Sequence, residues 1–142
     1  MEGIPHQATS VAIGGCALLM EGSPGSGKSS LALALIDRGA VLIGDDGVLL
    51  APQEDRLIAR PHPRTRGLLE VRNLGLLPFP VCEAAPVALI VLLDPQAPRF
   101  VEEAQIVTRA GFALPLIRLA PEGPVLHIKT ECALTQYGLT WG

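Results

Sequence analysis

Residues 22–29 read Gly-Ser-Pro-Gly-Ser-Gly-Lys-Ser, a complete G-x-x-x-x-G-K-S phosphate loop, and the predicted architecture follows from it. The glycines let the backbone curl so that successive N–H groups point at phosphate oxygens. Lys28 places a cation on the terminal phosphates, and the Ser29 hydroxyl is suited to bind Mg²⁺. A helix that begins in the loop adds its positive N-terminal end. The stretch therefore predicts a binding site for a nucleoside triphosphate and Mg²⁺.

The flanking sequence has the context that this motif needs. The apolar run Cys16–Met20 before the loop predicts a buried strand. Residues 30–38 are rich in Leu and Ala and predict a helix, which Gly39 would end. The alternative is a Gly/Ser-rich turn that binds nothing, but such a turn has no need of Lys28 and Ser29.

Composition narrows the class of protein. The 142 residues predict one domain, residues 1–142, whose 49% apolar residues can bury an aliphatic core. The net charge of −3 argues against non-specific binding to nucleic acid. No apolar run reaches the roughly 18 residues of a membrane helix, and no leader is evident, so we expect a cytoplasmic protein. The three scattered cysteines predict reduced, mostly buried thiols.

Two acids follow the next predicted strand, Ala40–Gly44, which completes a β-loop-α-β unit and is expected to pair in parallel with the strand before the loop. Asp45 and Asp46 thus stand at the carboxyl end of a strand, where open α/β sheets place ligands. Asp46-Gly47 is also a turn signal, and both interpretations can hold. Asp94 ends the most apolar strand, residues 86–94, and competes with the pair for the role of second acidic motif.

Polar residues interrupt the apolar segment 68–77. Glu70 and Arg72 share one face if the segment is extended, which predicts either a site or an internal ion pair. The preceding loop carries Arg60, Arg64 and Arg66. These arginines could contact phosphates or an acidic partner, and the alternative is that the loop is simply solvated.

The other elements are predicted from periodicity and turn signals. Residues 48–50 and 57–59 predict a hairpin. Residues 100–110 predict a modest amphipathic helix. Residues 114–119 predict an edge strand, because Pro115 interrupts it. Residues 131–137 predict a last helix, capped by Thr130 and stopped by Gly138.

Over about residues 6–94 the chain resembles the catalytic domain of HPr kinase/phosphorylase in the order and spacing of four motifs. The four motifs are the phosphate loop, Leu-Ala-Leu-Ile-Asp-Arg-Gly, Val-Leu-Ile-Gly-Asp-Asp, and Leu-Leu-Glu-Val-Arg-Asn-Leu-Gly. The resemblance implies a P-loop-containing α/β domain with a mixed sheet and flanking helices. It implies an ATP- and Mg²⁺-dependent kinase that phosphorylates a serine of HPr, the phosphocarrier of the sugar phosphotransferase system. It also implies a homo-oligomer, since the family forms hexamers.

The resemblance implies a role for individual residues. Lys28 and the loop would hold the nucleotide phosphates, and Ser29 and Glu70 would bind Mg²⁺. Asp46 would accept the proton of the substrate hydroxyl, with Asp45 maintaining the charge pattern. The implied catalytic set is Asp46, Lys28, His6, Asp45 and Arg72, and the implied cofactor-binding set is Gly22, Ser23, Pro24, Gly25, Ser26, Gly27, Lys28, Ser29 and Ser30.

Two departures from the family pattern matter. The family usually has Glu where this chain has Ser30. The C-terminal half has no arginine-containing V-x-P-G-R loop, so the resemblance implies the kinase reaction rather than dephosphorylation.

Two other functions remain open at this point. The domain could phosphorylate a small molecule, which a pocket closed over the acceptor would favour. It could also be a nucleotide-binding sensor without turnover, which the lack of a carboxylate near Ser29 would favour.

Overall fold

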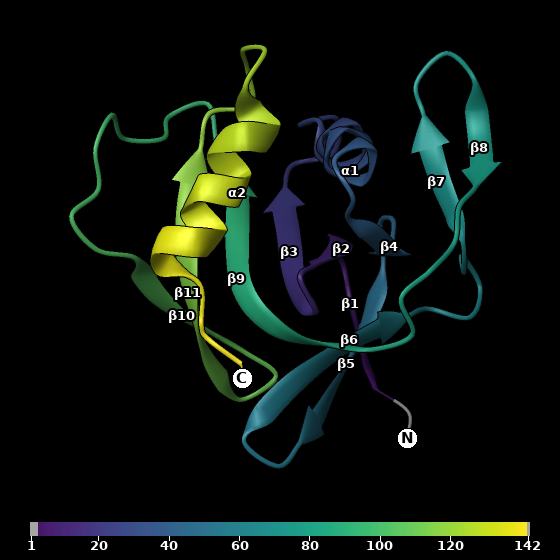
Figure 1. Ribbon diagram of the computed structural model, residues 1–142, viewed down its shortest axis with the longest axis horizontal. Helices are drawn as coiled ribbons and strands as arrows, with labels where there is room; N and C mark the ends of the chain where they lie inside the picture. The colour runs from purple at the N-terminus through teal and green to yellow at the C-terminus, as the bar shows by residue number, and fades with distance from the viewer. Residues whose placement is uncertain (1–2, 142) are drawn as a thin grey trace.

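The computed structural model describes residues 3–141 and shows an α/β fold (Figure 1). A curled, mixed nine-stranded sheet carries both helices on one face, and a two-stranded hairpin stands beside it. The predicted fold class is confirmed. Of the predicted single domain, residues 1, 2 and 142 lie outside the described part.

The elements follow one another in a strand-rich order. The strands are β1 (Ile4–His6), β2 (Thr9–Ile13), β3 (Cys16–Gly22), β4 (Val41–Gly44), β5 (Val48–Gln53), β6 (Arg56–Pro61), β7 (Leu68–Val71), β8 (Gly75–Pro78), β9 (Ala85–Leu93), β10 (Gln105–Arg109) and β11 (Phe112–Leu119). The helices are α1 (Lys28–Asp37) and α2 (Leu126–Tyr137). The predicted helix after the phosphate loop and the predicted hairpin, here β5–β6, are therefore confirmed.

The main sheet has the order β1-β5-β6-β9-β3-β2-β4, and β11 and β10 continue from β9. β9 pairs in parallel with both β3 and β11, so it is central, as its apolar sequence predicts. The expected parallel pairing of β4 with β3 is wrong, because β2 lies between them and pairs antiparallel with each. The tight turn at Gly14 and Gly15, both with positive φ, pairs β2 with that edge of β3, so this edge is not available to β4.

Side chains alternate between two apolar cores. Leu18 and Met20 of β3 pack with Leu31 and Leu35 of α1 on the helix-covered face. Leu19 faces the opposite core, over which β5 and β6 curl. Since β3 is buried on both faces, its carboxyl end and the loop that follows have a firm base.

The predicted helix over residues 100–110 is wrong. Residues 105–109 form β10, which pairs antiparallel with β11 through a two-residue turn. Ala110 and Gly111 in that turn both have positive φ, the conformation that such hairpins require. The β-branched run Ile106-Val107-Thr108 fits a strand, and pairing with β11 prevails over the weak helical spacing of apolar residues.

Three further expectations need correction. β11 is not an edge strand, because it lies between β10 and β9, and Pro115 precedes the part that pairs with β9. α2 begins a turn before Thr130, whose hydroxyl donates to the Leu126 carbonyl inside the helix at 2.8 Å. Cys132 is exposed rather than buried, while Cys16 and Cys82 are half-buried.

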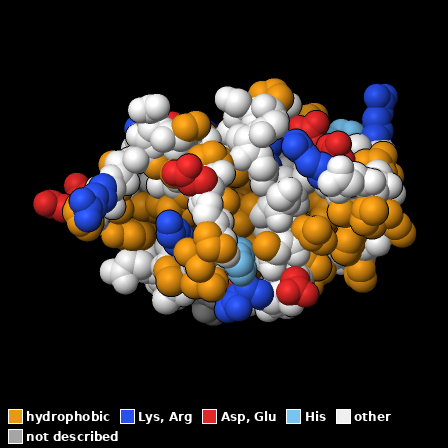
Figure 2. All heavy atoms as spheres, turned by 90° about the horizontal axis from the view of Figure 1, so that it is seen from above, with side chains coloured by type: hydrophobic (Ala, Val, Ile, Leu, Met, Phe, Trp, Pro, Cys, Tyr) orange, Lys and Arg blue, Asp and Glu red, His pale blue; other side chains and the backbone are white. Residues whose placement is uncertain are grey.

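The molecular surface mixes charged and apolar side chains. Seen from the side of the phosphate loop, Lys and Arg lie among acidic and apolar groups (Figure 2). Apolar atoms gather on the side where Figure 1 places β7 and β8, and Leu74 and Leu76 of that hairpin are 70% and 64% exposed. Neither helix of the described chain has the length and hydrophobicity that crossing a bilayer requires.

Candidate active site

The phosphate loop runs from the end of β3 into the first turn of α1. Gly22, Gly25 and Gly27 have φ values of 152°, 80° and 103°, so the curl depends on glycine at these positions. The Lys28 ammonium folds back and donates to the carbonyl oxygen of Gly22 at 2.8 Å. The loop therefore keeps the curled shape that directs its amides inward, with a cation at its centre.

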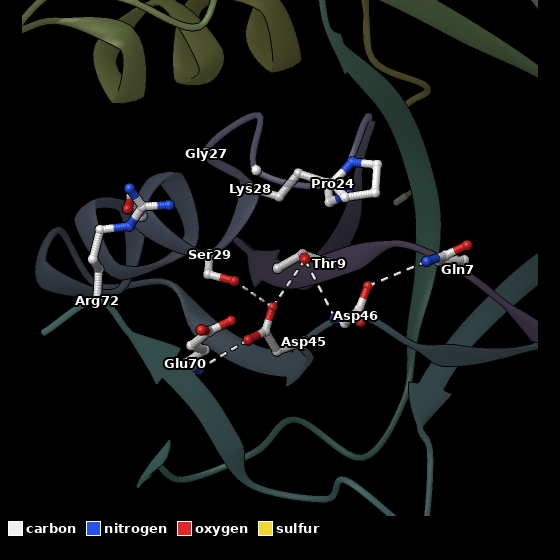
Figure 3. Close-up of a pocket in the computed structure, with 12 residues that line it drawn as sticks. Gln7, Thr9, Pro24, Gly27, Lys28, Ser29, Asp45, Asp46, Glu70 and Arg72 are labelled. Carbon is white, nitrogen blue, oxygen red and sulfur yellow. Dashed lines mark hydrogen bonds between the residues drawn. The ribbon is translucent and has the colours of Figure 1, made fainter. Parts of the chain in front are cut away.

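A hollow of about 250 Å³ opens in front of this loop (Figure 3). The phosphate loop and the first turn of α1 form one wall, and β4, β7 and the N-terminal strands form the others. Its lining comprises Gln7, Thr9, Pro24, Gly25, Gly27, Lys28, Ser29, Ser30, Asp45, Asp46, Glu70 and Arg72. The structure thus brings together the phosphate loop, the aspartate pair after β4, and Glu70 and Arg72 of the β7–β8 hairpin, from three separate segments.

Asp45 connects three walls of this hollow. Asp45 is buried, with a relative exposure of only 8%. Its Oδ1 accepts hydrogen bonds from the Ser29 hydroxyl at 2.7 Å and the Thr9 hydroxyl at 3.0 Å, and its Oδ2 accepts one from the Glu70 N–H at 2.9 Å. A carboxylate that accepts three such bonds orients Ser29 and ties β7 to the loop.

Asp46 lies in a different environment from its neighbour. It is exposed, and its backbone adopts a left-handed φ of 58°, which turns its side chain away from that of Asp45. Its carboxylate has one long contact, with the Gln7 amide at 3.5 Å. The carboxylate is therefore open to a hydroxyl group that enters the hollow, as a general base must be.

Glu70 and Arg72 come from the β7–β8 hairpin. Glu70 is on β7 and Arg72 follows in the turn, and both line the hollow. The Glu70 carboxylate lies beside Asp45 (Figure 3). Among the described residues no ion pair links Glu70 to Arg72. The two residues are instead related by lining the same hollow.

His6 and Asp94 do not line this hollow. His6 Nε2 lies 2.8 Å from Oε2 of Glu21, on β3. Asp94 borders a second hollow of about 530 Å³ with Glu21 and Ser23, and its Oδ1 accepts a hydrogen bond from the Gln96 N–H. The acids that the sequence left as alternatives are thus separated, because only Asp45 and Asp46 share the hollow of Ser29.

The three arginines before β7 are also outside the hollow, and the loop predicted for Arg60 is wrong, since Arg60 lies on β6 and only Arg64 and Arg66 lie in the loop. Arg66 forms an ion pair with Glu83 at the surface. The hydrogen bond to Glu83 raises the pKa of Arg66.

Sequence reasoning missed four polar residues around the site. Thr9 and Gln7 line the hollow but stand in a short polar segment that carries no recognisable motif. Glu21 and Arg109 form an ion pair with a 2.7 Å contact. A carboxylate at the end of an apolar strand, directly before the loop, is a signal that could have drawn attention to Glu21.

Glu21 is the most strongly perturbed acid of the site. Burial of its carboxylate would raise its pKa, but hydrogen bonds from His6 and Arg109 outweigh burial and lower the pKa to about 2. The hydrogen bonds to Glu21 in turn raise the pKa of Arg109. The ion pair is therefore charged over the whole physiological range.

The oxygen groups beside Ser29 fit a magnesium ion. Among the described residues no cluster of three or more His, Cys, Asp and Glu side chains could hold a metal by itself. Mg²⁺ commonly uses only one or two carboxylates, with substrate phosphates and waters completing the octahedron. The Ser29 hydroxyl with Asp45 and Glu70 offers such hard oxygen donors at the edge of the hollow.

Comparison with known proteins agrees with this architecture. The family described as HPr Serine kinase C-terminal domain matches residues 3–81. The chain is also similar to the solved structure of the Hpr(Ser) kinase/phosphatase from Coxiella burnetii. That match has a TM-score of 0.83 and 24% identity, and it covers 93% of this chain and 88% of that one. At this identity the match shows the fold.

Curated relatives share higher identity over a shorter segment. The HPr kinase/phosphorylase of Mycoplasma mycoides is 34% identical over 86 residues, which cover 56% of this chain and 28% of that protein. The HPr kinase/phosphorylase of Clostridium tetani is 44% identical over 66 residues, which cover 46% of this chain and 22% of that protein. The match thus spans about a quarter of the length of these relatives.

Proposed function

Because the chain belongs to the HPr serine kinase C-terminal domain family, we propose that it is a protein serine kinase that transfers the γ-phosphoryl group of ATP to a serine of an HPr-type phosphocarrier protein. The observation that carries the proposal is the meeting of the phosphate loop, the buried Asp45 and the open Asp46 in one hollow. A phosphoryl transfer leaves little covalent work to the protein, so positioning and charge are what such a site must supply.

The phosphate loop would bind the nucleotide. Its amides would donate to the β- and γ-phosphates, and Lys28 would exchange the Gly22 carbonyl for a phosphate oxygen. Arg72, at the rim of the same hollow, would add a second cation toward the transferred group.

Ser29 and Glu70 would hold Mg²⁺, with Asp45 fixing the Ser29 hydroxyl through its 2.7 Å hydrogen bond. The ion, when bound, neutralises charge on the β- and γ-phosphates. A carboxylate beside Ser29 is also what a kinase needs and a sensor does not, so Asp45 argues against the sensor alternative.

Asp46 would act on the acceptor serine. Its carboxylate would accept the hydroxyl proton as the serine oxygen bonds to the γ-phosphorus and the bond from that phosphorus to ADP breaks. Its exposed position leaves room for a side chain presented by another protein. His6 would not touch the reacting groups and would act only indirectly, through its contact with Glu21.

The experiment is incubation with labelled ATP, Mg²⁺ and purified HPr. Asp46→Asn should lower transfer to HPr by at least about a hundredfold, the usual contribution of a general base, and should leave MgADP affinity nearly unchanged. Lys28→Ala, the companion variant, should lose nucleotide affinity as well. Equal transfer by wild type and Asp46→Asn would remove Asp46 from its role. Wild type that binds MgATP but leaves HPr unlabelled would contradict the proposed substrate.

The family resemblance also leads us to propose a cytoplasmic homo-oligomer, with six subunits as in the family. Light scattering of the purified chain measures this assembly directly.

A further inference from the structure

The carboxylate of Glu21 joins three segments that are distant in the sequence. Arg109 on β10 donates two hydrogen bonds to it, from Nη2 to Oε1 at 2.7 Å and from Nε to Oε2 at 3.1 Å. His6 on β1 lies 2.8 Å from the same Oε2. The side chains of Glu21, His6 and Arg109 are 13%, 24% and 27% exposed, so water only partly screens the cluster.

This cluster borders the point where the phosphate loop leaves the sheet. Glu21 directly precedes Gly22, and Gly22 is where the loop folds back on itself. The Gly22 carbonyl accepts the Lys28 hydrogen bond at 2.8 Å, and a Cβ on Gly22 would lie 2.7 Å from the Ser26 hydroxyl oxygen. Whatever holds Glu21 in place therefore also holds the start of the loop.

β10 and β3 are not neighbours in the sheet, since β11 and β9 lie between them, so the contact of Arg109 with Glu21 is one of side chains. A two-pronged guanidinium–carboxylate contact fixes direction as well as distance, which a single ion pair does not. Arg109 also lies beyond residues 3–81, the segment that the family model matches.

We propose that Arg109 is a positioning residue of the phosphate loop, which through Glu21 holds the loop in the shape that receives nucleotide phosphates. The inference rests on the proposed nucleotide binding by that loop. A loop already held in its binding shape spends less conformational entropy when the ligand arrives. Without Arg109, Glu21 and Gly22 gain freedom, and phosphates must order the loop themselves.

The test is calorimetric titration of the full chain with MgADP. Arg109→Met should raise the Kd about tenfold, and Arg109→Lys, which keeps the charge but loses the fork, should raise it less. Glu21→Gln keeps the shape of the side chain and should also weaken binding. The double variant Glu21→Gln/Arg109→Met should bind no more weakly than Arg109→Met alone, because both changes break one contact.

Arg38→Met is the matched control. It breaks another arginine–glutamate pair, Arg38 with Glu131, which joins α1 to α2 away from the hollow. This control should leave the Kd for MgADP unchanged even if its melting temperature falls. In kinase assays Arg109→Met should raise KM for ATP more than it lowers kcat.

The outcomes separate this inference from the proposed function. Wild type that fails to bind MgADP overturns both. Wild type that binds, with Arg109→Met and a folded Glu21→Gln binding equally well, overturns the positioning role alone. An equal loss of affinity in Arg38→Met would also overturn it, since the effect would then be one of general stability.

Discussion

At the residue scale, the neighbouring Asp45 and Asp46 have opposite environments. Asp45 is buried and accepts three hydrogen bonds, whereas Asp46 is exposed and has one long contact. The left-handed backbone at Asp46 produces this contrast, since it directs adjacent side chains to different surroundings. One aspartate is therefore suited to structure and the other to chemistry.

This contrast predicts different effects on stability. Asp45→Ala leaves the Ser29 and Thr9 hydroxyls and the Glu70 N–H without their acceptor, so we expect it to lower the free energy of unfolding by about 2 to 3 kcal/mol. Asp46→Asn, which keeps a residue type that tolerates the left-handed backbone, should change it by no more than about 0.5 kcal/mol. Urea unfolding followed by circular dichroism measures both. Equal losses for the two variants would contradict the assignment of Asp45 as the structural acid.

At the element scale, the strand–loop–helix unit works because β3 ends rigidly and the loop then packs against itself. β3 is buried on both faces and paired on both edges, with β2 and β9. The loop can thus expose its amides without relying on a ligand to give it shape. The residue at the junction, Gly22, has no space for a larger side chain.

Gly22→Ala should therefore weaken MgADP binding by more than about tenfold, equivalent to 1.4 kcal/mol or more. The new Cβ would lie 2.7 Å from the Ser26 hydroxyl oxygen and 3.1 Å from the Leu93 carbonyl oxygen, so the loop must shift. Gly14→Ala is the control, because Gly14 also has positive φ but has nothing within 4 Å of an added Cβ. Calorimetric titration compares the two, and similar affinities would show that the loop tolerates the shift.

At the scale of the whole molecule, the cluster of Glu21, His6 and Arg109 connects the strands β1 and β3 with the β10–β11 hairpin. Its energetic value depends on pH, because the carboxylate must be ionised to accept these hydrogen bonds. Burial opposes ionisation, but hydrogen bonds from His6 and Arg109 lower the pKa of Glu21 from 4.5 to about 2.

The sign of the pH dependence follows from this lowered pKa. The unfolded chain binds a proton at Glu21 near pH 4.5, before the folded protein does, so the stabilisation is complete above pH 4.5 and disappears as the pH falls toward 2. We expect the difference in free energy of unfolding between wild type and Glu21→Gln to shrink by about 3 kcal/mol over that interval. Urea unfolding at a series of pH values measures it. Parallel pH profiles for the two proteins would contradict the prediction.

The local sequence determined the elements whose signals are short-range. The glycines and Lys28-Ser29 specify a phosphate loop by backbone conformation and charge, and the Leu/Ala run after them specifies α1. The apolar run of β9 indicated a central strand for the same reason, since only burial on both faces suits it. These features are set within a few residues, and so they could be predicted without knowing what packs where.

Only the tertiary structure decided the rest, because it depends on partners distant along the chain. Residues 105–109 have weak helical spacing, yet hydrogen bonding to β11 makes them β10. Asp45 and not Asp94 lies beside Ser29, although Asp94 follows the strand that pairs with β3 at Gly22. The contact of Arg109 with Glu21, 88 residues apart, depends on how the sheet curls. Each is a long-range packing outcome, and its free energy exists only once the whole sheet has formed.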